Sequence, residues 1–147
     1  MIIGFSGSRK GINRLQKEYI NKFLFKNLPK IDEVHHGDCI GADATFNKIC
    51  YKMHISKIVL HPPKNPVLRA FCESEYKWEE KDYLDRDRDI IKCCDILLAC
   101  PYDSNPKYHS GTWYCINKAL ALGKIVYIIY QNGNVCKYNN TKDLKVI

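Results

Sequence analysis

Short apolar runs that end in glycine- or proline-bearing loops constrain this chain more than any other feature. Four of them begin at Met1, Ile31, Ile55 and Asp95, and a fifth follows Gly123. Between most of them, apolar residues recur at helical spacing. Near-continuous apolar strands that alternate with helices are typical of a parallel sheet buried on both faces. The pattern therefore predicts a three-layer α/β/α sandwich.

The boundaries of the predicted elements follow from this pattern. The expected strands cover residues 1–5, 31–36, 55–60, 95–100 and 124–130. A helix is expected over 82–94, with Tyr83, Ile90, Ile91 and Cys94 facing inward. Three prolines make His61 to Pro66 a loop, the stretch onward to Glu80 fits no pattern, and Gln131 to Asn134 is typical of a turn before a short strand or tail. The fold class expected is Rossmann-like, with a mainly parallel sheet of five or more strands.

The length of 147 residues predicts one domain over 1–147, because one core suffices at this size. With 46% apolar and 27% charged residues the composition is that of a globular protein, and there is no apolar run of membrane length. The first apolar run is too short for a secretory signal, so we expect a cytoplasmic location. A composition rich in Lys, Ile and Asn points to an AT-rich genome, viral or parasitic. For a viral protein, the expected location is the host cytoplasm.

Net charge and cysteine spacing indicate which kinds of partner and which kinds of site this chain is expected to have. The net charge of +7 is scattered without a dense basic patch, so we expect a solvated basic surface and no nucleic-acid partner. The eight cysteines form no Cys-x-x-Cys pair and are expected to be reduced, mostly buried thiols. No metal site is expected either, because the five histidines lack ligand spacing with one another or with the cysteines. They are His35, His36, His54, His61 and His109.

Glycine-bearing loops follow several of the predicted strands. The first places Gly7, Ser8 and Arg9 where a backbone can approach an anion and a guanidinium can bind it. This loop is equally consistent with a phosphate-binding loop and with a tight turn that carries a surface arginine. Further candidates stand at the starts of later helices, where free amides favour anions. They are His36, Gly37, Asp38, Gly41 and Asp43 in the second loop and Ser110, Gly111 and Thr112 in the last.

Two charged residues have two interpretations each. Asp43 either caps its helix or binds ribose hydroxyls, as acidic residues do in dinucleotide sites. Arg88 either pairs with Asp85 and Asp89 on an exposed helix or reaches the ligand. Asp43 and Arg88 are also the candidates for catalytic roles. Because the carboxyl ends of parallel strands meet at one sheet edge, we expect these loops to converge there.

With these residues assembled, the chain resembles the SLOG superfamily, a Rossmann-like group that includes the LOG-like phosphoribohydrolases, the DprA-type proteins and the small YspA-like proteins. It looks closest to the last. The resemblance runs from Ile3 to about Ile129. It rests on the ordered motifs GFSGSRKG, HHGDCIGADATF, HPP, DRDRDI, DILLACP and SGTWYCINKALALGKIV. A fainter similarity joins the latter half to nucleoside deoxyribosyltransferases and nucleotide N-hydrolases.

This resemblance implies a pocket for a nucleotide-derived, phosphate-bearing ligand, such as an ADP-ribose-like or cyclic nucleotide signal, that the protein senses or sequesters. It also implies a homodimer or higher homo-oligomer, and no further cofactor. Cys115 stands where the LOG-like enzymes carry a catalytic glutamate, and cleavage of an N-glycosidic bond needs a carboxylate beside the sugar. We therefore expect binding ahead of catalysis. The alternatives are a nucleoside 5′-monophosphate N-glycosidase and, behind it, a nucleic-acid-binding protein.

Overall fold

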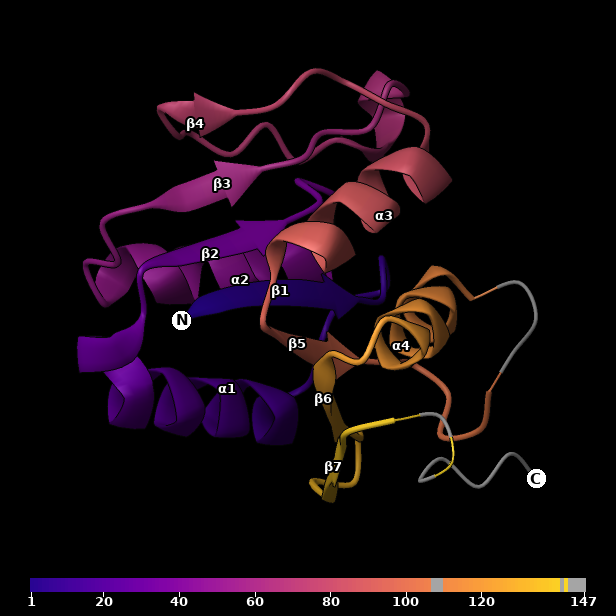
Figure 1. Cartoon of the computed structure of the whole chain (residues 1–147). Helices are drawn as coiled ribbons and strands as arrows, with labels where there is room; N and C mark the ends of the chain where they lie inside the picture. The colour runs from indigo at the N-terminus through magenta and orange to yellow at the C-terminus, as the bar shows by residue number, and fades with distance from the viewer. Residues whose placement is uncertain (107–109, 141, 143–147) are drawn as a thin grey trace.

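The computed structural model describes residues 1–106, 110–140 and 142. In this part of the chain, seven strands form one sheet in the order β4-β3-β2-β1-β5-β6-β7 (Figure 1). They are β1 (Ile2–Gly7), β2 (Glu33–His36), β3 (Ile58–Leu60), β4 (Tyr76–Lys77), β5 (Ile96–Cys100), β6 (Ile125–Ile129) and β7 (Val135–Tyr138). All neighbours are parallel except β6 and β7, which pair antiparallel. The predicted α/β sandwich with a mainly parallel sheet is confirmed.

Four α-helices complete the three layers. They are α1 (Arg14–Asn27), α2 (Ala42–Lys52), α3 (Tyr83–Cys93) and α4 (Gly111–Ala121), and two 3-10 turns cover Leu28–Lys30 and Pro66–Leu68. One apolar cluster joins α1 and α2 to one face of the sheet, and a second joins α3 and α4 to the other. The alternation of side chains along a strand explains the split, since Leu98 of β5 belongs to the first cluster and its neighbour Leu97 to the second.

The centre of the sheet packs tightly on both sides. Phe5 of β1 stacks on Phe46 of α2, with ring centroids 4.3 Å apart. On the opposite face, a Cβ built at Gly4 would lie 3.0 Å from the sulfur of Cys94, so glycine lets α3 approach β1 closely. The two helix layers are thereby held against β1, whose carboxyl end carries the first glycine-bearing loop.

One sequence prediction is wrong, and one stretch that fitted no pattern is now assigned. Tyr83 does not face inward: it is the first residue of α3 and 56% exposed, because the buried stripe of that helix runs through Arg86, Asp87, Ile90 and Ile91. The unpatterned stretch before α3 contains the 3-10 turn at Pro66–Leu68 and the edge strand β4, which pairs with β3 through two residues only. So short an element carries no periodic signal.

Candidate functional site

A cleft of about 430 Å³ lies where the chain order of the sheet reverses, between β1 and β5. In open parallel sheets this switch point, outside the carboxyl ends of the strands, is where ligands bind. The volume falls within the range of small-molecule sites. The lining comes from Phe5–Lys10, at the end of β1 and in the turn that follows; Gly37, Cys39 and Asp43 around the start of α2; Leu68; Tyr83, Arg86, Asp87 and Ile90 of α3; and Tyr102, Asp103 and Ser110–Thr112 before and at the start of α4.

The first wall is the turn after β1. A Cβ at Gly7 would come within 2.5 Å of the Ala42 Cβ, so only glycine lets the turn lie this close to α2. Ser8 closes the turn, because its carbonyl accepts from the Gly11 amide at 3.0 Å and its hydroxyl from the Lys10 amide at 3.0 Å. Arg9 and Lys10 are exposed, and the Lys10 ammonium lies 4.2 Å from the centre of the Tyr102 ring. The turn thus brings two cations to the mouth of the cleft.

The start of α2 is tied to that same turn. The Ala42 amide, the first of the helix, donates to the Ser8 carbonyl at 3.0 Å. Gly41 has a φ of 89°, and a Cβ there would lie 2.3 Å from the Arg9 carbonyl oxygen. Gly41 therefore supports the wall from behind and does not line the cleft. The first amide of α2 is already used by the protein, so this helix start differs from the one expected.

The start of α4 forms the opposite wall. The Ser110 hydroxyl caps the helix by accepting from the Trp113 amide at 3.2 Å. Gly111 and the buried Thr112 line the cleft together with Ser110. Among the described residues, nothing lies within 4 Å of a Cβ built at Gly111, which leaves room beside them at the amino end of this helix. An N-terminus open to a cleft attracts anions through its amides and dipole.

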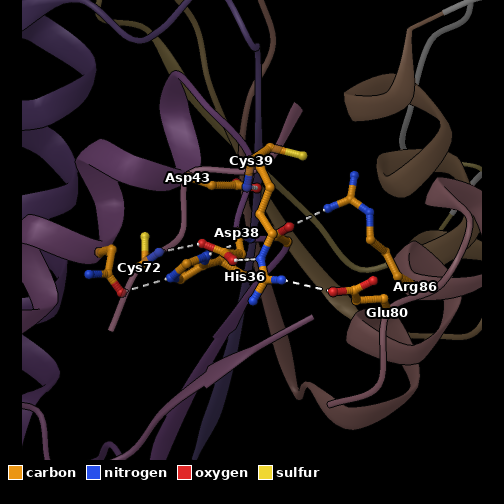
Figure 2. A network of polar contacts seen from close by, with 10 residues as sticks. His36, Asp38, Cys39, Asp43, Cys72, Glu80 and Arg86 are labelled. Atoms are coloured by element: carbon orange, nitrogen blue, oxygen red, sulfur yellow. Dashed lines mark hydrogen bonds and ion pairs between the residues drawn. The ribbon is translucent and has the colours of Figure 1, made fainter. Parts of the chain in front are cut away.

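The floor is one face of α3, where residues three and four apart point the same way. Tyr83, Arg86, Asp87 and Ile90 occupy this face. The Arg86 guanidinium crosses to the second loop, where its Nη1 donates to the Gly37 carbonyl at 2.6 Å (Figure 2). Its Nε is buried without a hydrogen-bond partner in the described structure. The Arg86 Nη2 stays 3.8 Å from the Asp87 carboxylate, too far for a hydrogen bond.

Buried acids lie beside this cation. Burial raises the pKa of Asp43, whose Oδ2 accepts from the Cys39 amide at 3.2 Å. Burial also raises the pKa of Asp87 to about 6, against the opposing influence of Arg86. The thiol of Cys115 lies beside the Asp87 carboxylate and the hydroxyl of Ser6, and burial holds the pKa of this thiol well above its usual value. A carboxyl group of the cleft lining thus lies beside a buried thiol.

Most of the candidates from the sequence come together in this cleft. They are Gly7, Ser8, Arg9, Gly37, Asp43, Ser110, Gly111 and Thr112. Gly41, His36, Asp38 and Arg88 do not line it. Arg88 is exposed and donates to the Asp85 carboxylate at 3.0 Å, so of its two interpretations the structure shows the ion pair. Arg86, two residues earlier, is the arginine of α3 that lines the cleft.

His36 and Asp38 organise the second loop from behind the cleft. The Asp38 amide donates to Nδ1 of His36 at 3.0 Å, so the ring proton is on Nε2, which donates to the Asn47 amide oxygen at 2.9 Å. The Asp38 carboxylate accepts from Nε of Arg69 and from the amide of Cys72, both at 2.9 Å (Figure 2). Both residues are fully buried, which fits a structural role.

Other classes of site find little support in the described residues. Within 1–106, 110–140 and 142, no group of three or more His, Cys, Asp or Glu side chains is placed to hold a metal ion; His109 lies outside these residues. No helix of the described chain is long and apolar enough to cross a membrane. Five of the eight cysteines are buried, as the apolar spacing predicts.

Comparison with known proteins agrees with this architecture. The crystal structure of TM1055, a target of the Northeast Structural Genomics Consortium, superimposes with a TM-score of 0.58 at 16% sequence identity, over 85% of this chain and 71% of that one. The likeness shows a Rossmann-like fold. No family model and no curated protein matches the sequence. At this identity the match extends to the fold alone, and function has to be argued from the cleft itself.

Proposed function

We propose that the cleft binds a phosphate-bearing ligand derived from a nucleotide, which the protein senses or sequesters. One observation carries the proposal: the Ser6–Lys10 segment, at the end of β1 and in the turn after it, and the start of α4 line the same cleft, although they lie about a hundred residues apart in the chain. The first supplies two cations and the second supplies helix amides, and both favour a phosphate. The ordered motifs shared with the SLOG superfamily support the same ligand class.

The remaining lining suits the rest of a nucleotide. Asp43 and Asp87 offer carboxyl oxygens to the hydroxyls of a ribose. Tyr83 and Tyr102, 56% and 47% exposed, present aromatic rings at the rim on which a base can stack. A phosphate group, a sugar and a base therefore each meet side chains of matching chemistry.

Isothermal titration with adenosine 5′-monophosphate, ADP-ribose and cyclic AMP tests the proposal. We expect micromolar binding of at least one nucleotide, and a loss of about tenfold in affinity, or about 1.4 kcal/mol, in Arg9→Ala. Arg88→Ala is the matched control: it removes an exposed arginine outside the cleft and should bind like wild type. Failure of all three nucleotides to bind at micromolar concentration would overturn the proposal.

A second candidate, hydrolysis of a nucleoside 5′-monophosphate, is favoured by the raised pKa of Asp87, a buried carboxyl group that lines the cleft. In that reaction the bond from C1′ to the base nitrogen breaks, water adds to C1′, and the departing base takes a proton. A protonated Asp87 is suited to supply that proton. Release of free base from adenosine 5′-monophosphate, reduced about 100-fold or more in Asp87→Asn but not in Arg88→Ala, would favour this reaction over simple binding. No release by wild type would remove it.

A further inference from the structure

The floor of the cleft holds more buried negative charge than positive charge. Asp43, Arg86 and Asp87 are 6%, 9% and 7% exposed, and all three line the cleft. With both carboxyl groups ionised, two negative charges would face one guanidinium. Burying net charge in a protein interior is costly, and such clusters commonly resolve the cost by keeping one acid protonated.

Hydrogen bonding does little to offset this imbalance. The close contact of Arg86 is to the Gly37 carbonyl at 2.6 Å, whereas its nearest approach to Asp87 is 3.8 Å. The polar neighbour of Asp87 on α4 is the thiol of Cys115, a weak donor, and Asp43 accepts from one amide at 3.2 Å. The raised pKa of Asp87, about 6, agrees with this geometry and places its titration close to neutral pH.

The groups that face the pair come from every neighbouring element. Arg86 on α3, Asp43 on α2 and Cys115 on α4 act on Asp87, and Ser6 of β1 lies behind the thiol. Asp43 also faces His36, Asp38 and Cys39. Nδ1 of His36 accepts from the Asp38 amide, the Asp38 carboxylate is paired with Arg69, and burial raises the pKa of the Cys39 thiol to about 11. In the described structure Arg86 is therefore the cation that acts on Asp87.

An anion that enters this cleft adds further negative charge beside the pair. We propose that Asp87 takes up a proton when an anionic ligand binds, so that the cleft binds its ligand more tightly as pH falls through the neutral range. This inference rests on the proposed function. A nearby negative charge favours the neutral carboxylic acid, and by linkage the protonated cleft favours the anion to the same extent. The protonated carboxyl group of Asp87 can then donate a hydrogen bond to an oxygen of the ligand.

Titration calorimetry in buffers of different ionisation heat measures this proton directly. With the same three nucleotides, wild type should take up a proton on binding and gain about tenfold in affinity between about pH 8 and about pH 6. Asp87→Asn mimics the protonated acid, so at about pH 8 it should bind more tightly than wild type, with little dependence on pH. The difference in proton uptake between these two proteins cancels any titration of the nucleotide itself.

The control and the remaining outcomes separate the two proposals. Asp85→Asn alters an exposed acid of the same helix and should keep the proton uptake of wild type. Binding without proton uptake, or uptake that persists in Asp87→Asn, overturns this inference and leaves the proposed function standing. No binding at any pH overturns both. If Asp87→Asn does not fold, carbon-13 NMR of the wild-type carboxyl groups replaces it: the pKa of Asp87 should rise when nucleotide saturates the cleft, and an unchanged pKa overturns the inference.

Discussion

At the scale of single residues, Gly37 determines where the buried cation of the cleft lies. A Cβ at this position would come within 1.9 Å of Nη1 of Arg86 and 2.9 Å of the Asp43 carboxylate. Both neighbours are buried and have little room to move. The missing side chain is therefore what allows the Arg86 guanidinium to reach the Gly37 carbonyl.

Gly37→Ala should displace Arg86 and break this hydrogen bond. Because a charged donor would then remain buried without its partner, we expect a loss of about 2 kcal/mol in unfolding free energy, measured by chemical denaturation. Gly111→Ala is the matched control for stability, since a Cβ there meets no atom of the described residues within 4 Å and the residue is helical. Equal stability of Gly37→Ala and Gly111→Ala would contradict the assigned role.

Outside the cleft, two buried histidines make the stability of the folded protein sensitive to acid. Nδ1 of His35 and Nε2 of His61 lie 2.8 Å apart, and Nε2 of His35 lies 2.7 Å from the Glu33 carboxylate. Burial lowers the pKa of both histidines, that of His61 to about 3. Since a histidine in the unfolded chain protonates near its ordinary value, protonation favours the unfolded state. Their contribution to stability is present above about pH 6.5 and is lost as pH falls toward 3.

Asp87 has the opposite sign, because its raised pKa lets the folded protein gain stability as pH falls through about 6. The histidine effect is therefore best measured as a difference between wild type and His61→Gln, which retains Asp87. Between about pH 7 and pH 5, wild type should lose about 2 kcal/mol relative to His61→Gln in denaturation experiments. Parallel stability curves for the two proteins over this range would show that His61 does not titrate on unfolding.

At the scale of elements, Asp38 holds the long connection between β3 and α3. This fully buried residue sits at a φ of 51° and accepts from Arg69 and from the amide of Cys72, both in that connection. The Asp38 carbonyl accepts from the Ala70 amide at 2.8 Å. The same connection supplies Leu68 to the lining of the cleft. A residue that resembles a ligand contact in the sequence thus positions part of the cleft wall.

Asp38→Asn should loosen this connection. Arg69 would keep its contacts with the half-exposed Glu80 and with the Phe71 ring, but its largely buried guanidinium would lose the charged partner beside it. We expect a loss of about 3 kcal/mol in unfolding free energy. Asp85→Asn breaks an exposed pair and should cost less than about 1 kcal/mol. A similar small cost for both variants in urea denaturation would argue against an anchoring role.

The sequence predicts the helices and strands that have strong apolar patterns. It does not predict which side of a helix faces the sheet where the pattern fits more than one side. The turn at Gly7 and the start of α4 are visible because glycines and hydroxyl residues follow or precede apolar runs. The choice between Arg86 and Arg88 depends on which side of α3 faces the sheet, and the alternating DRDRD segment hides it. Counting four residues back from the apolar Ile90 would have selected Arg86. The role of Asp38 rests on contacts with residues about thirty positions away, which no local pattern carries.

At the scale of the whole molecule, the cleft exists because the chain changes direction between β1 and β5. Strands β2 and β3 extend the sheet on one side of β1, and β5 and β6 extend it on the other (Figure 1). The connections that leave β1 and β5 at this point diverge to opposite faces, toward α1 and α4. The space between them is the cleft, with α3 as its floor. The same topology thus explains why segments that lie far apart in the sequence line one cleft.

If a nucleotide phosphate binds in this shared space, both walls of the cleft should respond to the same ligand. Nitrogen-15 NMR of the amides, followed as each of the three nucleotides is added, measures this response. The amides of Gly7, Ser8, Arg9, Gly111 and Thr112 should shift together with one binding curve. Shifts confined to surfaces outside the cleft, or no shift with any nucleotide, would contradict it.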